Sequence, residues 1–315
     1  MHRYKLIAPA KINLYLEILG DRPDGYHELA MVMQTIQLAD QVEISALGTQ
    51  TIQVSCNHPE VPQDSSNLAY RAADLMERSF PKAFEQFGGV RIVIDKHIPV
   101  GAGLAGGSSN AAAVLVGLDL LWNLGLTKTE LQDLGAQLGS DVPFCIAGGT
   151  LLATGRGEQL SPLPDLEGVS LVLAKYRSLS VSTVWAYQTY RQQFKETYRS
   201  PGDGFTLRHK QVHSGTMVAA IGAKNVAVIA QELYNDLEKV VLPALPPVQR
   251  LRQTFAQYPE VTGTLMSGSG PTVFALCPSL EAAQTIAQRI QTDINDPDLQ
   301  VWTTETTPTG IRLAE

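Results

Sequence analysis

The chain has 315 residues, of which 44% are hydrophobic and 17% are charged, so it can bury a sizeable core. Its formal net charge of -7 disfavours nucleic acid as the main partner, because phosphate backbones require a basic surface. Three scattered cysteines indicate reduced thiols rather than disulfides, and we expect a cytoplasmic protein. No stretch has the pattern of a membrane span or a cleaved leader, so we expect no membrane partner.

Strands dominate the predicted structure of the first hundred residues. Apolar and polar positions alternate in 11–19, 41–47 and 51–55, and 90–98 is a further strand. Between the first two strands, Gly, Pro and Asp-Gly mark 20–29 as an irregular loop.

Three helices are predicted within the first 140 residues. The segment 67–80 has helical spacing and opens on Asn67, a favourable N-cap. A long apolar helix is expected over 108–124. Thr127 is followed three residues later by Glu130, a capping box that predicts another helix.

Beyond residue 160 the pattern changes, and we expect a second α+β domain. The predicted division is therefore 1–160 and 161–315. The segment 195–215 shows no periodicity and is predicted to be an exposed insertion. The remaining elements are predicted as strands in 170–176, 262–277 and 299–307 and helices in 181–194, 216–240, 246–257 and 279–291.

The stretch PVGAGLAGGSSNAAAVL (99–115) is the most informative part of the chain. It contains Gly101-x-Gly103-x-x-Gly106, a dinucleotide fingerprint when read literally, but no Walker A lysine. A dinucleotide site also needs a second strand ending in an acidic residue about 20 residues later. Here one helix runs into another, which disfavours that interpretation.

Two other interpretations of the glycine stretch remain. A tight turn that lets helices pack closely would need fewer glycines and would not explain Ser108 and Ser109. Successive backbone N–H groups, together with a helix N-terminus and these two hydroxyls, would instead form an anion cradle. The sequence therefore favours a triphosphate site.

The pattern Pro-x-Gly-x-Gly-Leu-x-x-Gly-Ser-Ser resembles the phosphate loop of the GHMP kinases, which include galactokinase, homoserine kinase and mevalonate kinase. LMSGSGPTVFAL (265–276) resembles their C-terminal glycine motif. The resemblance implies a two-domain α+β fold with a ferredoxin-like C-terminal domain, and ATP with Mg²⁺ as cofactor. No cluster of ligand residues has the spacing of a dedicated metal site. The implied ATP-binding residues are Pro99, Val100, Gly101, Ala102, Gly103, Leu104, Ala105, Gly106, Gly107, Ser108 and Ser109.

Three further stretches narrow the resemblance to one branch of these kinases. They are APAKINLYLEILGDRPDGYHEL (8–29), GSDVPFC (139–145) and NDLE (235–238). That branch phosphorylates the 2-hydroxyl of a cytidine-diphosphate-linked methylerythritol, a small molecule of non-mevalonate isoprenoid biosynthesis. The match extends over nearly the whole chain apart from 195–230. One departure is Ala105, where relatives often carry glycine. Because alanine at positive φ costs about 1 kcal/mol, we expect an ordinary backbone there.

Two charged residues are candidates for the chemistry. Asp141 precedes an apolar run and could be a buried structural partner or a base; the resemblance implies the catalytic base. Lys11 alone would be taken as a surface strand lysine. The resemblance places it opposite Asp141, where it keeps that carboxylate ionised and stabilises the attacking oxygen. Asn13 lies on the same strand face and is implied to contact substrate.

The resemblance also implies a slot for cytosine. Tyr26 would stack on the base and His27 would hydrogen-bond its edge, although on their own both suit a surface loop. A second ring would come from Tyr187 or Trp185; the family pattern favours Tyr187, with Thr183 near the substrate.

Three alternative functions stay open at this stage. Another GHMP kinase would not need DGYHEL, and a ligand sensor without turnover would not need both Lys11 and Asp141. An oxidoreductase would have to bind NAD(P). The oligomeric state is not predicted.

Overall fold

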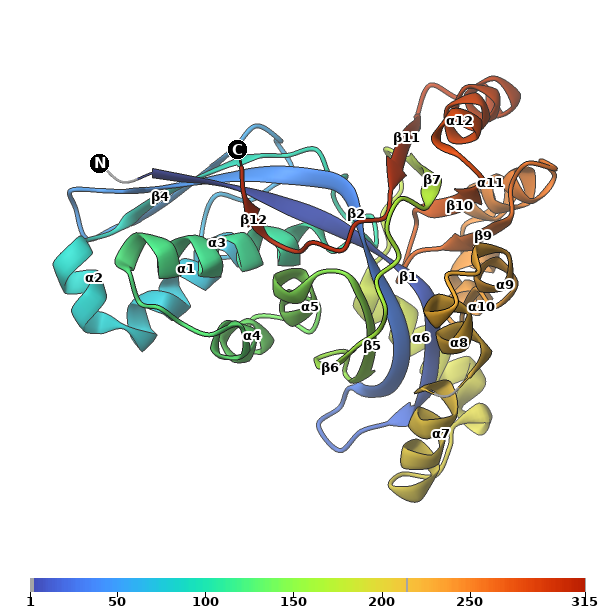
Figure 1. Ribbon diagram of the computed structural model, residues 1–315, viewed down its shortest axis with the longest axis horizontal. Coiled ribbons are helices and arrows are strands. Elements are labelled where there is room, and N and C mark those ends of the chain that lie inside the picture. Colours follow the sequence, from blue (N-terminus) through green and yellow to red (C-terminus); the bar gives the residue numbers. More distant parts are fainter. Residues whose placement is uncertain (1–2, 214, 315) are drawn as a thin grey trace.

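The computed structural model describes residues 3–213 and 215–314 and contains two β-sheets with helices packed on them (Figure 1). The larger sheet has eight strands in the order β12-β1-β2-β4-β3, with β5 on β2, β6 on β5 and β8 on β1. These strands are β1 (Arg3–Asp21), β2 (His27–Ala46), β3 (Ile52–Cys56), β4 (Val90–Asp95), β5 (Thr150–Gly155), β6 (Gln159–Pro162), β8 (Tyr234–Asn235) and β12 (Arg312–Leu313).

The β1–β2 hairpin lies at the centre of the larger sheet and is longer than predicted. The expected loop 20–29 shrinks to 22–26, because Asp21 and His27 already pair across the two strands. Register shifts interrupt the pairing between Pro9 and Lys11 and again between Asn13 and Tyr15. Such irregularities bend a strand and re-aim its side chains. These irregularities flank Lys11 and Asn13, the two candidate site residues of this strand.

Five helices accompany the first sheet: α1 (Leu68–Ser79), α2 (Pro81–Phe87), α3 (Gly106–Trp122), α4 (Lys128–Ala136) and α5 (Val142–Ala147). The Asn67 side chain accepts a hydrogen bond from the Ala69 amide, and the capping box of Thr127 and Glu130 is formed, so both predicted caps are confirmed. Most of helix α3 is buried, and a side chain at Gly117 would collide with Ile44. The carboxyl half of α3 is thereby held close to the sheet, and near its amino end the Ser109 hydroxyl bonds the Pro9 carbonyl of β1.

The second sheet is antiparallel, with the order β11-β7-β10-β9. Its strands are β7 (Ser170–Tyr176), β9 (Gly263–Met266), β10 (Val273–Cys277) and β11 (Leu299–Glu305), and the helices packed on it are α11 (Pro246–Ala256) and α12 (Leu280–Ile294). This order of two β-α-β halves is the ferredoxin-like arrangement that the resemblance implied.

Most described residues of 195–215 are exposed, as predicted, but the segment is helical and packs on the first hairpin, which the sequence did not indicate. The segment contains the short helix η1 (Lys195–Thr197) and α7 (Asp203–His213). Arg208 of α7 bonds Glu17 at 3.0 and 2.8 Å, and the Phe205 ring packs on Gly20. Val212 is also buried in the core, but a few apolar contacts combined with polar ones leave no hydrophobic period in the sequence. Figure 1 shows α7 below the strand ends that carry the β1–β2 loop.

The helix expected over 216–240 is also a misassignment. The structure has α8 (Thr216–Gly222), α9 (Val226–Gln231), β8 and α10 (Glu238–Ala244) in its place. Helix α6 (Thr183–Phe194) is close to its prediction. The domain boundary at residue 160 stays a prediction, since β8 and β12 return to the first sheet. Among the described residues, no helix has both the length and the apolar character needed to cross a bilayer.

Candidate active site

A cavity of about 820 Å³ gathers most of the residues singled out in the sequence. It is bounded by the segment before α3, the middle of β1, the start of α5, the first turns of α6 and the turn at 268–269. Of the predicted residues, it is lined by Lys11, Asn13, Tyr26, His27, Asp141, Thr183, Tyr187 and every residue from Pro99 to Ser108.

The glycine stretch forms a cradle at one end of this cavity. Gly101 and Gly103 have φ of 59° and 74°, and α3 begins at Gly106. The amino end of this helix therefore faces the cavity with unpaired backbone N–H groups, an arrangement that attracts phosphate. Ala105 also has a left-handed backbone, with φ of 56°. The expected ordinary backbone at Ala105 is wrong, because this residue caps α3 in that conformation.

The C-terminal glycine motif packs directly on the cradle. The Ser267 hydroxyl donates a 3.1 Å hydrogen bond to the Gly103 carbonyl. A Cβ added to Gly103 would lie 2.3 Å from the Ser267 carbonyl oxygen, so only glycine fits. The two motifs that are far apart in the sequence thus form one wall.

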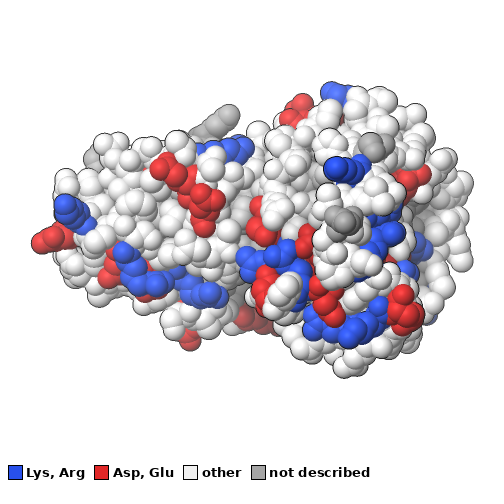
Figure 2. Space-filling model, turned by 90° about the horizontal axis from the view of Figure 1, so that it is seen from below, with Lys and Arg blue, Asp and Glu red and all other residues white. Residues whose placement is uncertain are grey.

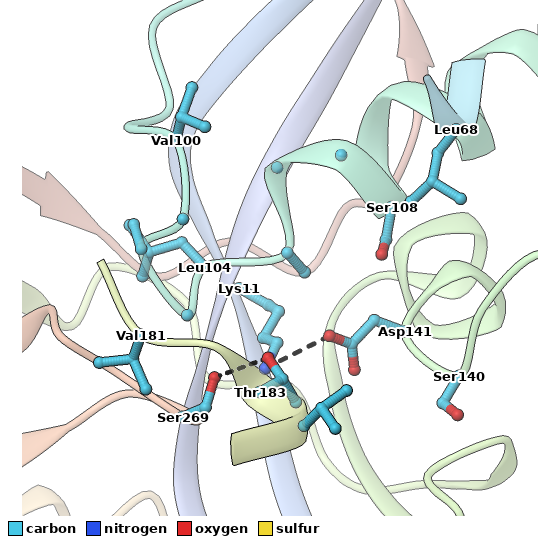
Figure 3. A pocket seen from close by; sticks show the side chains of 18 of the residues that line it. Lys11, Leu68, Val100, Leu104, Ser108, Ser140, Asp141, Val181, Thr183 and Ser269 are labelled. Carbon is cyan, nitrogen blue, oxygen red and sulfur yellow. Dashed lines mark hydrogen bonds and ion pairs between the residues drawn. The ribbon is translucent and has the colours of Figure 1, made fainter. Parts of the chain in front are cut away.

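The two serines at the start of α3 differ in direction. Ser108 points into the space that also holds Lys11 and Asp141 (Figure 3). Ser109 is fully buried, and its hydroxyl donates to the Pro9 carbonyl at 2.7 Å. The side chain of Ser109 is therefore outside the cavity, in contrast to the expectation that both hydroxyls would face phosphate.

Lys11 and Asp141 meet at the centre of the cavity. Lys11 is 4% exposed, and its Nζ lies 2.6 Å from Asn13 Oδ1 and 3.7 Å from Asp141 Oδ2 (Figure 3). Asp141 precedes α5 without capping it through its side chain, so the carboxylate is directed to the cavity. Burial, with the nearby Asp141 charge, raises the pKa of the Cys145 thiol, which makes a nucleophilic thiolate here unfavourable.

Aromatic side chains lie at the opposite end of the cavity. The His27 and Tyr187 rings are 5.2 Å apart at 33°, and the Arg156 guanidinium lies 4.9 Å from the exposed Tyr26 ring. Burial, with a contribution from Arg191, lowers the pKa of His27 to about 4, so the ring is neutral at pH 7. Trp185 does not line the cavity, whereas Tyr187 does.

Two arginines of this region escaped the sequence analysis. Arg191 of α6 bonds Asp21 at 2.6 Å and the Gly25 carbonyl at 3.1 Å, and Arg156 covers Tyr26. Neither has a motif around it, and only the fold brings them to the β1–β2 loop. Figure 2, which views the molecule from below, shows basic and acidic side chains next to one another.

A buried ion pair under the cradle was also missed. Asp40 is fully buried beside Lys96 and accepts hydrogen bonds from Asn110 Nδ2 at 2.8 Å and from the Ile98 amide at 2.8 Å. Lys96 also lines the cavity. On the other side, the Thr183 and Ser269 hydroxyls are 2.9 Å apart, which ties α6 to the C-terminal glycine motif (Figure 3).

Both halves of the chain match one family. Residues 67–149 match the GHMP kinases N terminal domain, and residues 217–296 match the GHMP kinases C terminal domain. The glycine cradle and the two sheets are thus those of an ATP-using kinase class.

Relatives narrow the class. The 4-diphosphocytidyl-2-C-methyl-D-erythritol kinases of Trichormus variabilis and Nostoc sp. are 62% and 61% identical to this chain, each over 99% of both sequences. A crystal structure of 4-(cytidine 5'-diphospho)-2C-methyl-D-erythritol kinase is 30% identical, with a TM-score of 0.73 over 97% of this chain and 100% of that one. The chain belongs to the 4-diphosphocytidyl-2-C-methyl-D-erythritol kinases, a branch of the GHMP kinases.

Proposed function

We propose that the protein transfers the γ-phosphoryl group of ATP to the 2-hydroxyl of 4-diphosphocytidyl-2-C-methyl-D-erythritol, in non-mevalonate isoprenoid precursor biosynthesis. The observation that carries the proposal is the position of the Lys11–Asp141 pair. It lies between an anion cradle at one end of the cavity and an aromatic group at the other. A phosphate donor and a nucleoside-linked alcohol can thus meet at this pair.

Phosphoryl transfer to an alcohol needs alignment, charge neutralisation and an acceptor for the hydroxyl proton. In the proposed reaction the Asp141 carboxylate accepts that proton. Lys11, held by Asn13 at 2.6 Å, supplies positive charge beside the attacking oxygen. The cradle amides and the α3 amino end bind the triphosphate.

Mg²⁺ is part of the proposal because it accompanies ATP in this chemistry. Ser108, whose hydroxyl points into the cavity, is an oxygen donor of the kind magnesium prefers. Phosphate oxygens and water would complete its ligands. When bound, the ion would neutralise charge on the transferred group.

Recognition of the cytidine end is assigned to the aromatic group. Tyr187 and Tyr26 would stack on the base, and His27 would bond its edge. Stacking on an aromatic side chain is worth about 1–3 kcal/mol per base but does not distinguish bases. Thr183 and Asn13 line the cavity between the two ends, where the methylerythritol would lie.

The reaction is proposed to take place in the cytoplasm. Cys56, Cys145 and Cys277 are free, which suits a reducing compartment.

The test is release of ADP from ATP and Mg²⁺ in the presence and absence of 4-diphosphocytidyl-2-C-methyl-D-erythritol. We expect ADP only when the acceptor is present, and phosphorus NMR should show a new phosphomonoester while the diphosphate persists. The same assay with homoserine or mevalonate as acceptor is the control for other kinases of the class. ADP at background level with the cytidine compound, or faster release with a control acceptor, would contradict the proposal.

A further inference from the structure

One ring nitrogen of His27 is enclosed and has no hydrogen bond. His27 is 7% exposed and lines the cavity, yet its Nε2 is buried without a partner. Because buried polar atoms are nearly always paired, such an atom requires an explanation. Since Nε2 is enclosed, Nδ1 is the ring nitrogen available to a ligand in the cavity.

A carboxylate lies beside the enclosed nitrogen. Asp21 Oδ1 lies 3.8 Å from His27 Nε2. Arg191 holds the same oxygen at 2.6 Å and thereby fixes the carboxylate beside the ring. On another side, the Tyr198 ring meets the His27 ring at 89° with 6.0 Å between centroids, so the imidazole has little freedom to turn.

This arrangement determines which nitrogen of the imidazole carries the proton. Burial and Arg191 keep the ring neutral at pH 7, so His27 has one N–H and one lone pair. A lone pair on Nε2 would face the Asp21 oxygen and be repelled, whereas an N–H there is attracted. A carboxylate behind one nitrogen therefore sets the tautomer and the role of the other nitrogen.

We infer that Asp21 is a specificity-determining positioning residue, which holds the His27 proton on Nε2 and presents Nδ1 to the cavity as a hydrogen-bond acceptor. An acceptor matches the exocyclic amino group of cytosine and opposes the carbonyl oxygen that uracil has in its place. The pocket thus selects a nucleobase that offers an amino donor. This inference rests on the proposed function, because it presumes that a pyrimidine nucleotide binds beside His27.

The tautomer itself is measured on the ligand-free protein. Labelling with ¹⁵N-histidine gives separate NMR signals for protonated and unprotonated ring nitrogens, and His27→Gln identifies those of His27. We expect a protonated Nε2 and an unprotonated Nδ1 in the wild type. In Asp21→Asn, whose amide can also donate, we expect a mixture of both tautomers. A wild type with the proton on Nδ1 would overturn the inference, and this result needs no variant to fold.

The consequence for selectivity is measured by calorimetry with CDP, UDP and ATP. We expect the wild type to bind CDP at least ~10-fold more tightly than UDP, and Asp21→Asn to reduce this ratio below ~3. ATP affinity should be unchanged, which shows that the fold is intact. A loss of packing alone would weaken CDP and UDP equally and leave the ratio unchanged.

The matched control is Asp95→Asn. Asp95 Oδ2 lies 3.2 Å from His97 Nε2, so it is also a carboxylate beside a histidine, but both residues are half exposed and neither lines the cavity. We expect the control to keep the wild-type His27 tautomer and the CDP:UDP ratio. An Asp21→Asn variant that retains the wild-type ratio would overturn the inference. Absence of CDP binding to the wild type would instead contradict the proposed function, whatever the tautomer.

Discussion

The two ends of the cavity are built in different ways. At the cradle, 99–109, most of the shape comes from neighbouring residues: two positive-φ glycines, the left-handed Ala105 and the start of α3. At the other end, the recognition loop (residues 22–26) and His27 depend on distant segments. Arg191 of α6 bonds Asp21, just before this loop, and the Gly25 carbonyl within it, and His209 of α7 contacts the Leu29 carbonyl at 3.2 Å.

The difference separates what is fixed locally from what is fixed by tertiary structure. A cradle made of backbone amides binds any triphosphate and tolerates little change in its glycines. A recognition loop supported by side chains from elsewhere can be altered without changing the phosphate site. We therefore expect substitutions at the two ends to have separable effects, with Lys11 and Asp141 common to both.

The largest effect on turnover is expected at Asp141, where the two ends of the cavity meet. Asp141→Asn removes the proposed proton acceptor, and we expect kcat to fall by roughly 10²–10⁴-fold, the usual contribution of a positioned base. CDP and ATP should still bind, because neither end of the cavity is changed. Steady-state kinetics and calorimetry measure the two quantities. Near-normal kcat in this variant would assign the proton to another acceptor.

A smaller effect on binding is expected when a contact that supports the recognition loop is removed. Arg208→Met breaks the paired bonds to Glu17 without touching the cavity. Without these bonds the ends of β1 and β2 should be less well ordered, and ordering them on CDP binding costs free energy. CDP affinity should therefore fall by ~3–10-fold, whereas ATP affinity should not change. Leu207→Ala, at an exposed position on the same helix, is the control. Equal loss of both nucleotides would show that α7 supports the whole fold instead.

The pH dependence sharpens the description of the recognition end. The pKa of His27 is lowered from 6.5 to about 4, so the unfolded chain binds the extra proton between these values. The free energy of unfolding should therefore decrease as pH falls from about 6.5 to about 4, and less steeply in His27→Gln. The contribution of His27 to CDP affinity, taken as the ratio of wild type to His27→Gln, should be constant from about pH 6 to 8, because the CDP phosphate titrates equally in both. A change in this ratio centred near 6.5 would indicate a solvated histidine.

The smallest effect is expected at Ala105. Alanine in a left-handed backbone costs about 1 kcal/mol, so Ala105→Gly should raise the free energy of unfolding by up to that amount. Ala102→Gly in the same loop, where φ is not positive, should lower it by about 0.5–1 kcal/mol. Denaturant unfolding compares the two. Destabilisation by both variants would contradict the assigned backbone of the cradle.

The difference between locally and tertiary-determined structure also explains which features could be predicted from the sequence. The cradle, the caps at Asn67 and Thr127 and the strand that carries Lys11 all leave local patterns. The backbone of Ala105 could not be predicted, because the surrounding fold overrides the preference of alanine. Arg191 and α7 were missed because isolated contacts between remote segments, polar or apolar, have no period and no motif.

The central claim is that one cavity has two separable ends that meet at Lys11 and Asp141. Calorimetry with CDP and a non-hydrolysable ATP analogue on the wild type, Gly103→Val and Tyr187→Ala tests it most directly. Gly103→Val places a side chain against the Ser267 carbonyl and should abolish binding of the ATP analogue while CDP still binds. Tyr187→Ala removes a stacking ring and should weaken CDP by about 1–3 kcal/mol without affecting the ATP analogue. Normal ATP-analogue affinity in Gly103→Val, or equal weakening of both ligands in either variant, would contradict the claim.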